Sequence, residues 1–304
     1  MSNSSCSNQI GSRVAFLVGA GRSGTTLLYK LLCLHSKVAY TSNYDNRAPW
    51  LPSGMMLRFM ADLTGSKLNA WFNRGGNAYF INRPWVNKLF PTPVEGESIY
   101  ESCGIPLFPS NDYHPDSRSS DCLRRRFERI RRNSGAQVII SKRTANNRRL
   151  PHLDSIFPDS KYVHLIRDGR EVANSLSRVE WWDAHTLWWD GRTPAQMELA
   201  GEDRLTICAR NWTYEMRALQ AGLANIDSER ILEIRYEQLL ADPVGQIGAI
   251  IGFLGLAVTK EYQDAIESLQ LSYRPGSWPT RWTSDQLANV LREEQPLLND
   301  LGYF

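Results

Sequence analysis

The sequence is poor in cysteine and histidine, with five of each among 304 residues. The cysteines are scattered and form no CxxC pair, and no histidine stands at metal-ligand spacing from them. This pattern argues against a zinc site and against the dense disulfide framework of a small secreted domain. We therefore expect reduced thiols, no bound metal and no metal requirement. The five cysteines are Cys6, Cys33, Cys103, Cys122 and Cys208.

Long hydrophobic runs are also absent. No stretch approaches the ~20 apolar residues that span a bilayer, and the N-terminal "MSNSSCSNQIGSR" lacks the apolar centre of a signal peptide. The formal net charge of +3 is too small for the whole molecule to attract a nucleic acid or a membrane surface. We expect a cytoplasmic protein with neither of these partners, and any attraction for an anion must be local.

Positive charge is concentrated in one basic run, "RRRFERIRR" at residues 124–132. Leu123, Phe127 and Ile130 fall on one stripe of a helix, so the arginines would form the solvated face of that helix. This interpretation is favoured over a nucleic-acid patch.

Short apolar runs alternate with amphipathic stretches, which is typical of a parallel sheet covered by helices. We expect strands over 13–18, 137–141, 161–166 and 230–234. We expect helices over 25–34, 168–178, 205–223, 243–254 and 284–295, the last ended by Pro296. The prediction is one α/β domain over residues 1–304, a three-layer fold of the P-loop type with a central parallel sheet.

The stretch from about 48 to 118 departs from this pattern, because it is rich in Pro, Gly, Asn and aromatic residues and has no sustained period. One interpretation is an irregular insertion with its own small aromatic core. Another is an acceptor-recognition region over the active edge of the sheet. The two are compatible.

The segment "GAGRSGTT", residues 19–26, follows an apolar run and precedes an amphipathic one. Gly19 and Gly24 have the spacing of a phosphate-binding loop, but Thr25 stands where a kinase has its lysine. The cation is inside the loop instead, at Arg22. This arrangement suits a ligand with fewer bridging phosphates and no obligatory metal, although an atypical kinase stays an alternative. A purely structural turn is disfavoured, since a charge and several hydroxyls crowd a helix start.

Two further motifs point to anion binding. In "FPDSKYVHLIRDGREVANSLSR", residues 157–178, Arg167 ends a strand and Ser175 follows eight positions later on a helix, so both can face one anion. In "RYEQLLADP", Tyr236 follows another strand.

Together, "GRSGTT", "RDGREVANSLS", "RYEQLLADP" and the C-terminal "LLNDLGY" resemble the PAPS-dependent sulfotransferases, particularly the branch of tyrosylprotein sulfotransferases and their bacterial relatives. The matching blocks cover the first 47 residues and most of the chain from about residue 137. The resemblance implies transfer of a sulfuryl group from 3′-phosphoadenosine-5′-phosphosulfate (PAPS) to an acceptor hydroxyl or amine, leaving the bisphosphate PAP.

The resemblance also implies roles for single residues. Arg167 and Ser175 would hold the 3′-phosphate, and Tyr236 would contact the nucleotide. Arg178, and Arg281 in "RPGSWPTRWTSDQL", are looser matches to further basic contacts. The 5′-phosphosulfate would lie against Gly21, Arg22, Ser23, Gly24, Thr25 and Thr26.

Sulfuryl transfer needs a cation at the leaving oxygen and a base for the acceptor proton. Arg22 is one candidate for the cation, and Lys142 in "VIISKRT" matches a lysine that the family places beside the scissile bond. For the base, Asp45 in "YTSNYDNRAP" lies where the tyrosylprotein branch carries glutamates, although it could instead cap a loop. His185 is the competing base.

His185 lies in "VEWWDAHTLWWDGR", residues 179–192, where four tryptophans follow the motif with Ser175. This segment could be a wall of the acceptor pocket, an aromatic mini-core or a dimer patch, so a homodimer stays open. We expect a small-molecule acceptor such as a secondary metabolite, with a tyrosyl peptide or protein as the alternative. A catalytically dead nucleotide-binding protein is disfavoured, because an idle site has no need of Arg22, Lys142, Arg167 and Ser175 together.

Overall fold

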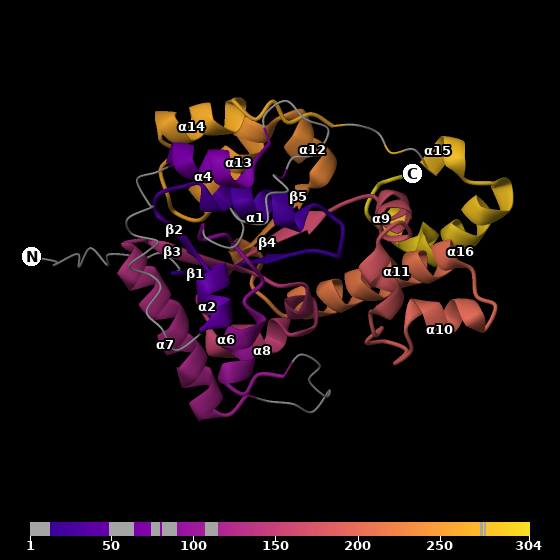
Figure 1. Cartoon of the computed structure of the whole chain (residues 1–304), viewed down its shortest axis with the longest axis horizontal. Coiled ribbons are helices and arrows are strands. Elements are labelled where there is room, and N and C mark those ends of the chain that lie inside the picture. Colours follow the sequence, from indigo (N-terminus) through magenta and orange to yellow (C-terminus); the bar gives the residue numbers. More distant parts are fainter. Residues whose placement is uncertain are drawn as a thin grey trace, which may run out of the picture.

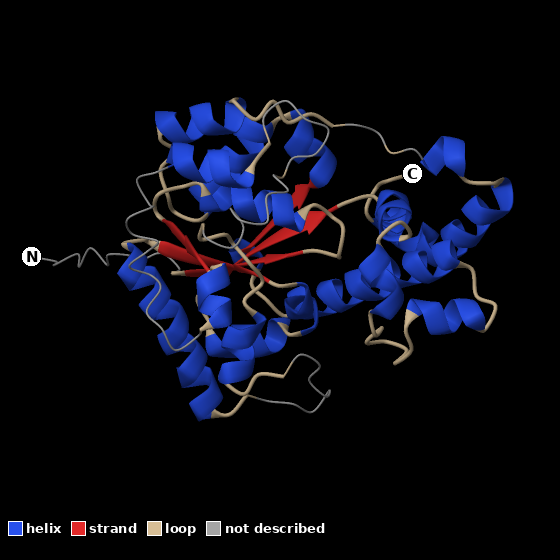
Figure 2. Ribbon diagram, viewed as in Figure 1, coloured by secondary structure: helices blue, strands red, loops and turns tan. Residues whose placement is uncertain are grey.

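The computed structural model describes residues 13–48, 64–73, 80, 90–106, 115–273, 276 and 278–304. Its centre is a five-stranded parallel sheet in the order β2-β3-β1-β4-β5 (Figure 2). The strands are β1 (Val14–Val18), β2 (Val38–Tyr40), β3 (Val138–Lys142), β4 (Lys161–Ile166) and β5 (Ile231–Arg235). The four expected strands are confirmed. The strand β2 was not predicted, because three residues are too few to show a period.

Helices cover both faces of the sheet (Figure 1). One layer holds α1 (Thr25–Cys33), α4 (Thr64–Trp71), α12 (Tyr236–Ala241), α13 (Pro243–Phe253) and α14 (Lys260–Glu267). The other holds α2 (Asn43–Arg47), α6 (Glu97–Ser102), α7 (Ser117–Ser134) and α8 (Leu150–Ile156). The expected three-layer α/β arrangement is therefore confirmed. Because all strands are parallel, their carboxyl ends meet at one edge, where such folds bind ligands.

A further group of helices gathers beyond β4 and β5, at the right of Figure 1. It has a core cluster of its own, which includes Leu176, Trp182, Met197, Cys208 and Val290. The helices are α9 (Gly169–Leu176), α10 (Pro194–Leu199), α11 (Arg204–Leu223), α15 (Trp278–Arg281) and α16 (Ser284–Asp300). Short 3-10 turns are η1 (Thr144–Arg148), η2 (Glu180–Ala184) and η3 (Ser228–Arg230). No helix in the described ranges is both long enough and apolar enough to cross a membrane.

The expected helix end at Pro296 is wrong, since α16 continues through this proline to Asp300. Proline removes one backbone donor from the helix. That loss is offset by burial of the next turn, because Leu297 and Leu298 are 5% and 0% exposed.

The arginine run lies on α7 as expected. Asp116 caps the start of this helix, Gly135 ends it in the left-handed conformation, and Leu123, Phe127 and Ile130 are buried. The amphipathic interpretation of residues 124–132 is confirmed.

Part of the stretch 48–118 lies outside the described residues. In the described part, Trp71, Phe72, Ile99 and Tyr100 belong to the same core as the sheet. Tyr100 donates or accepts a 2.8 Å hydrogen bond with Ser141 of β3. These described residues therefore extend the core of the sheet and do not form the separate aromatic core of the first interpretation.

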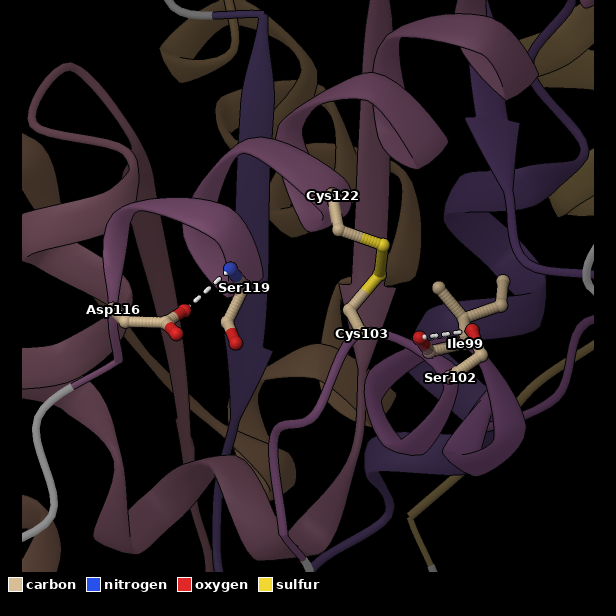
Figure 3. The surroundings of a disulfide bond; sticks show 6 residues. All are labelled: Ile99, Ser102, Cys103, Asp116, Ser119 and Cys122. Atoms are coloured by element: carbon tan, nitrogen blue, oxygen red, sulfur yellow. Dashed lines mark hydrogen bonds between the residues drawn. A yellow bond between two sulfur atoms is a disulfide. The ribbon is translucent and has the colours of Figure 1, made fainter.

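The expectation of five reduced thiols is wrong. Cys103, at the end of α6, and Cys122, in α7, form a disulfide with their Cα atoms 5.4 Å apart (Figure 3). Their separation of 19 residues carries no recognisable motif, and only the packing of α6 beside α7 brings them together. Cys33 and Cys208 are buried free thiols, and Cys6 lies outside the described residues. Because disulfides persist mainly in oxidising compartments, the bond weakens the cysteine-based case for the cytoplasm.

Candidate active site

The loop between β1 and α1 is built on close backbone approach. A side chain at Gly19 would bring its Cβ within 2.6 Å of the Leu165 carbonyl oxygen. At Gly24 the φ angle is +91°, and a Cβ would lie 2.4 Å from the Tyr236 ring. Glycine is thus required at both positions, by space and, at Gly24, by conformation. The two glycines let the loop lie against β4 and α12.

Arg22 has a φ of +68°, in the left-handed region that a side chain seldom adopts. Its Nε donates a 3.2 Å hydrogen bond to Ser175 Oγ on α9. Arg167, directly after β4, donates from Nη1 to the Arg22 carbonyl at 2.9 Å. The Arg167 guanidinium lies 4.4 Å from the centroid of the Tyr236 ring. Four residues that the sequence analysis singled out, from three segments, therefore lie together.

This cluster has unsatisfied positive charge. Partial burial and the like charge of Arg167 lower the pKa of Arg22. Among the ion pairs of the described residues none involves Arg22, and Glu171 approaches Arg167 Nη2 at 3.6 Å. Within the same described part, Ser23 Oγ and Arg167 Nε are buried and have no hydrogen-bond partner. Two guanidiniums and orphaned donors are what a bound phosphate-type anion would satisfy.

A cavity of about 470 Å³ opens beside the loop. The part of its lining that comes from the loop and the end of β4 consists of Gly21, Arg22, Gly24, Thr25, Thr26 and Arg167. Lys142, at the end of β3, lines the same cavity and pairs with Glu95, whose carboxylate also accepts a 3.2 Å hydrogen bond from the Thr144 amide. Lys142 is set beside the loop by the parallel pairing of β3 with β1. The predicted cations Arg22 and Lys142 thus share one cavity.

Another part of the cavity lining is aromatic and includes Trp181, Trp182 and His185. Trp182 stacks on the His185 ring with centroids 5.6 Å apart, and Trp181 meets His185 edge-on at 5.8 Å. Trp181 is 54% exposed although it lines the cavity. Partial burial and the nearby Arg148 lower the pKa of His185. Residues 179–192 are therefore a cavity wall through Trp181 and His185, and part of a core through the buried Trp182.

Glu215, on α11, is a site residue that the sequence analysis missed. Its buried carboxylate accepts hydrogen bonds from Asn147 Nδ2 at 2.8 Å, Arg148 Nη1 at 2.9 Å and Trp188 Nε1 at 2.6 Å. Asn147 also donates to the Gly19 carbonyl at 3.0 Å. Through these contacts Glu215 connects the loop between β1 and α1, the turn η1 and the aromatic wall formed by residues 179–192. A carboxylate among buried helix residues in "NWTYEM" is the signal that marks it.

Other predicted residues lie apart from the cavity lining. Asp45 is in α2, where its carboxylate and the Ser42 side chain form a capping box. Arg281, in α15, is exposed. Arg178 donates from Nε to the Asn174 carbonyl at 2.9 Å. None of these three residues is among the described residues that line the cavity.

Comparison with known proteins identifies the family of this chain. A model of the sulfotransferase family matches residues 94–260. Over 95% of its length the chain is 25% identical to the omega-hydroxy-beta-dihydromenaquinone-9 sulfotransferase Stf3 of Mycobacterium bovis, 74% of which is covered. A 108-residue stretch, 35% of the chain, is 26% identical to 25% of protein-tyrosine sulfotransferase 2 of Gallus gallus.

Solved structures of sulfotransferases have a similar fold. Sulfotransferase STF9 from Mycobacterium avium superposes with a TM-score of 0.61 at 16% identity, covering 95% of this chain and 76% of its own. A sulfotransferase domain from the curacin biosynthetic pathway gives 0.52 at 14% identity, with 97% and 98% covered. Because the family model spans more than half of the chain, this protein belongs to the sulfotransferase family and is an enzyme.

Proposed function

We propose that this enzyme transfers the sulfuryl group of PAPS to a hydroxyl, or an amine, of a small-molecule acceptor. Arg22 and Arg167 carry this proposal, because both guanidiniums line the cavity. Arg22 also bonds to Ser175 Oγ and has no acidic partner in the described structure. A nucleotide with phosphate-type groups at both the 3′ and 5′ positions offers an anion to each of them.

In this proposal the loop from Gly21 to Thr26 holds the 5′-phosphosulfate through Arg22, the hydroxyls of Ser23, Thr25 and Thr26, and the helix start at Gly24. Arg167 and Ser175 hold the 3′-phosphate. Tyr236 packs beneath the Arg167 guanidinium and so fixes its direction. Arg281 would need to move toward the cavity to contribute.

When bound, PAPS supplies a sulfuryl group that an acceptor oxygen can take by in-line displacement. Arg22 and Lys142 neutralise the charge that builds on the leaving oxygen. A carboxylate takes the acceptor proton. The threonine in place of the loop lysine fits a donor that needs no magnesium bridge between phosphates.

The acceptor end favours a small molecule with an apolar or planar body, because Trp181, Trp182 and Leu176 line it. The relative in Mycobacterium bovis is named for a hydroxylated menaquinone derivative, which has this character. A tyrosyl peptide is the alternative acceptor, given the partial match to protein-tyrosine sulfotransferase 2.

Calorimetric titration with PAP in the absence of metal, beside ATP with magnesium, tests the donor. We expect PAP to bind and ATP to be ignored. Arg167→Ala should weaken PAP binding about 10- to 100-fold, the scale of charge-assisted hydrogen bonds. Arg125→Ala, which removes an exposed arginine of α7, is the matched control and should bind PAP normally. If the protein binds magnesium–ATP and does not bind PAP, the proposed donor is wrong and the loop is that of an atypical kinase.

A further inference from the structure

We propose that Glu95 is the general base of the reaction and that Lys142 keeps it in an ion pair until the donor nucleotide binds. This inference rests on the proposed sulfuryl transfer. Glu95 lies in the stretch without a matching motif, so neither the loop motifs nor the resemblance points to it.

The segment that carries Glu95 is fixed to the active edge of the sheet. The Val94 amide donates a 2.9 Å hydrogen bond to the carbonyl of Thr41, which directly follows β2. Gly96 has a φ of +71°, and a Cβ there would lie 2.4 Å from the Thr41 side chain. Since β2 is the neighbour of β3, this contact sets Glu95 beside Lys142, at the carboxyl end of β3.

The Glu95 carboxylate is held by hydrogen bonds and is also accessible from the cavity. It pairs with Lys142 Nζ, and it accepts hydrogen bonds from the amide of Thr144 at 3.2 Å and from its hydroxyl at 3.4 Å. Its side chain is 45% exposed and lines the cavity, whereas Lys142 is 8% exposed. An acceptor hydroxyl in the cavity can therefore approach the carboxylate from the open side.

Asp45, the carboxylate expected from the sequence, is placed differently. It is 3% exposed, and its Oδ2 accepts hydrogen bonds from the amide and the hydroxyl of Ser42, at 2.9 and 2.5 Å. These contacts give it a capping role at the start of α2.

The pairing with Lys142 would make a poor base of Glu95 before the donor binds. Burial acts to raise the pKa of Glu95, but the Lys142 ammonium and the Thr144 amide outweigh it and hold the pKa below its usual range. Among the described residues, Arg143, which pairs with Glu97, and Tyr100 are further titratable groups that interact with Glu95. If Lys142 turns to the leaving oxygen, the carboxylate loses its main cationic partner and its basicity rises.

The step then balances. The Glu95 carboxylate takes the proton of the acceptor hydroxyl while the acceptor oxygen forms a bond to sulfur. The bond between sulfur and the 5′-phosphate oxygen breaks, and this oxygen keeps the electron pair and is neutralised by Lys142 and Arg22. The proton leaves Glu95 for water after the products depart.

Four variants of the full chain test the assignment: Glu95→Gln, Glu95→Asp, Asp45→Asn and Glu101→Gln. Glu101 is exposed on α6 and supplies the matched control for a carboxylate-to-amide change in the same segment. PAP formation from PAPS is measured with phenol, with 4-nitrophenol and with water alone as acceptor, beside PAP affinity by calorimetry.

We expect Glu95→Gln to lower turnover with phenol about 100-fold or more, the scale of general-base catalysis. The loss with 4-nitrophenol should be much smaller, because this acceptor ionises near neutral pH and its anion needs no base. PAP affinity should hold or rise, since Lys142 is released. Glu95→Asp should restore part of the turnover, and the acidic limb of the pH–rate profile should disappear in Glu95→Gln.

Wild-type turnover in Glu95→Gln, equal losses with the two phenols, or a loss in Asp45→Asn instead would each overturn the assignment. If neither phenol reacts with the wild-type enzyme, the rates of PAPS hydrolysis by the wild type and the four variants are compared instead, with water as the attacking group. A wild-type enzyme that binds no PAP would instead refute the proposed donor, which keeps the two failures apart.

Discussion

The indole nitrogen of Trp188 donates a 2.6 Å hydrogen bond to the carboxylate of Glu215, 27 residues later in the chain. The same carboxylate pairs with Arg148, whose side chain is 14% exposed. One buried acid thus holds the aromatic wall against the loop that follows β3. Removing it would take the carboxylate of a buried ion pair away from a largely buried guanidinium, which is costly.

We therefore expect Glu215→Ala to lower the free energy of unfolding by about 3–5 kcal/mol. Glu215→Gln keeps an acceptor oxygen and should lose clearly less. Urea denaturation of both variants measures the difference. Equal stability of the two variants would mean that the acceptor oxygen kept by the amide contributes nothing to holding the wall.

The second prediction concerns the phosphate loop. Gly24→Ala should destabilise the protein by about 1–3 kcal/mol, because the residue must keep a positive φ and its Cβ would meet the Tyr236 ring. Gly21→Ala is the matched control for stability, since nothing lies within 4 Å of a Cβ there. Thermal denaturation compares the pair. If Gly24→Ala is as stable as Gly21→Ala, the Tyr236 ring moves aside with no loss of folding free energy.

The loop and the strands around it illustrate what sequence could predict. The strand that ends just before Arg167 and the strand that ends at Lys142 are apolar runs of five or six residues between clear turn signals. Their ends, and the residues there, could therefore be read directly. Glu95 could not be found this way. Its position depends on the contact of Val94 with Thr41, about 50 residues away along the chain, and no local period records such a contact.

Asp45 shows the opposite case. Its place in a motif suggested chemistry, but the pattern Ser42 followed three residues later by an acid is also the pattern of a capping box, and the structure has that box. The disulfide between Cys103 and Cys122 was missed for a similar reason, because it depends on the packing of two helices joined by an irregular connection.

That disulfide gives the third prediction. It closes a loop over a separation of 19 residues, for which chain entropy predicts a stabilisation of about 3 kcal/mol. Cys122→Ser should lower the free energy of unfolding by that order, and reductant should do the same to the wild type. Urea denaturation with and without dithiothreitol measures both. Reductant should have no further effect on Cys122→Ser; an additional loss there would implicate other thiols.

The fourth prediction is a pH dependence on α7. The Arg131 guanidinium, aided by Arg132, lowers the pKa of Glu128 to about 2 from its ordinary 4.5. A depressed pKa contributes stability above pH 4.5 that is lost as the pH falls toward 2. Because Glu128 is 31% exposed, we expect no more than about 1 kcal/mol.

Glu128→Gln should therefore be less stable than the wild type at pH 7 and nearly equal to it at pH 2. Denaturation at the two pH values tests this. If the stability difference between Glu128→Gln and the wild type does not change with pH, the ion pairs of Glu128 with the arginines of α7 do not contribute to stability. Binding of an external partner by these arginines would then have to be considered again.

The last prediction concerns the acceptor end of the cavity. Trp181 is 54% exposed, yet it lines the cavity and contacts the His185 ring edge-on. A large apolar side chain left this open gains from burial under a ligand, and a stacked aromatic contact contributes about 0.5–1.5 kcal/mol beyond area. Trp181→Ala should raise KM for a planar acceptor such as 2-naphthol about 3- to 10-fold and leave PAP affinity unchanged. Steady-state kinetics with 2-naphthol and with a small aliphatic alcohol separate the effects. An equal rise for both acceptors would show that Trp181 shapes the cavity without recognising a planar ring.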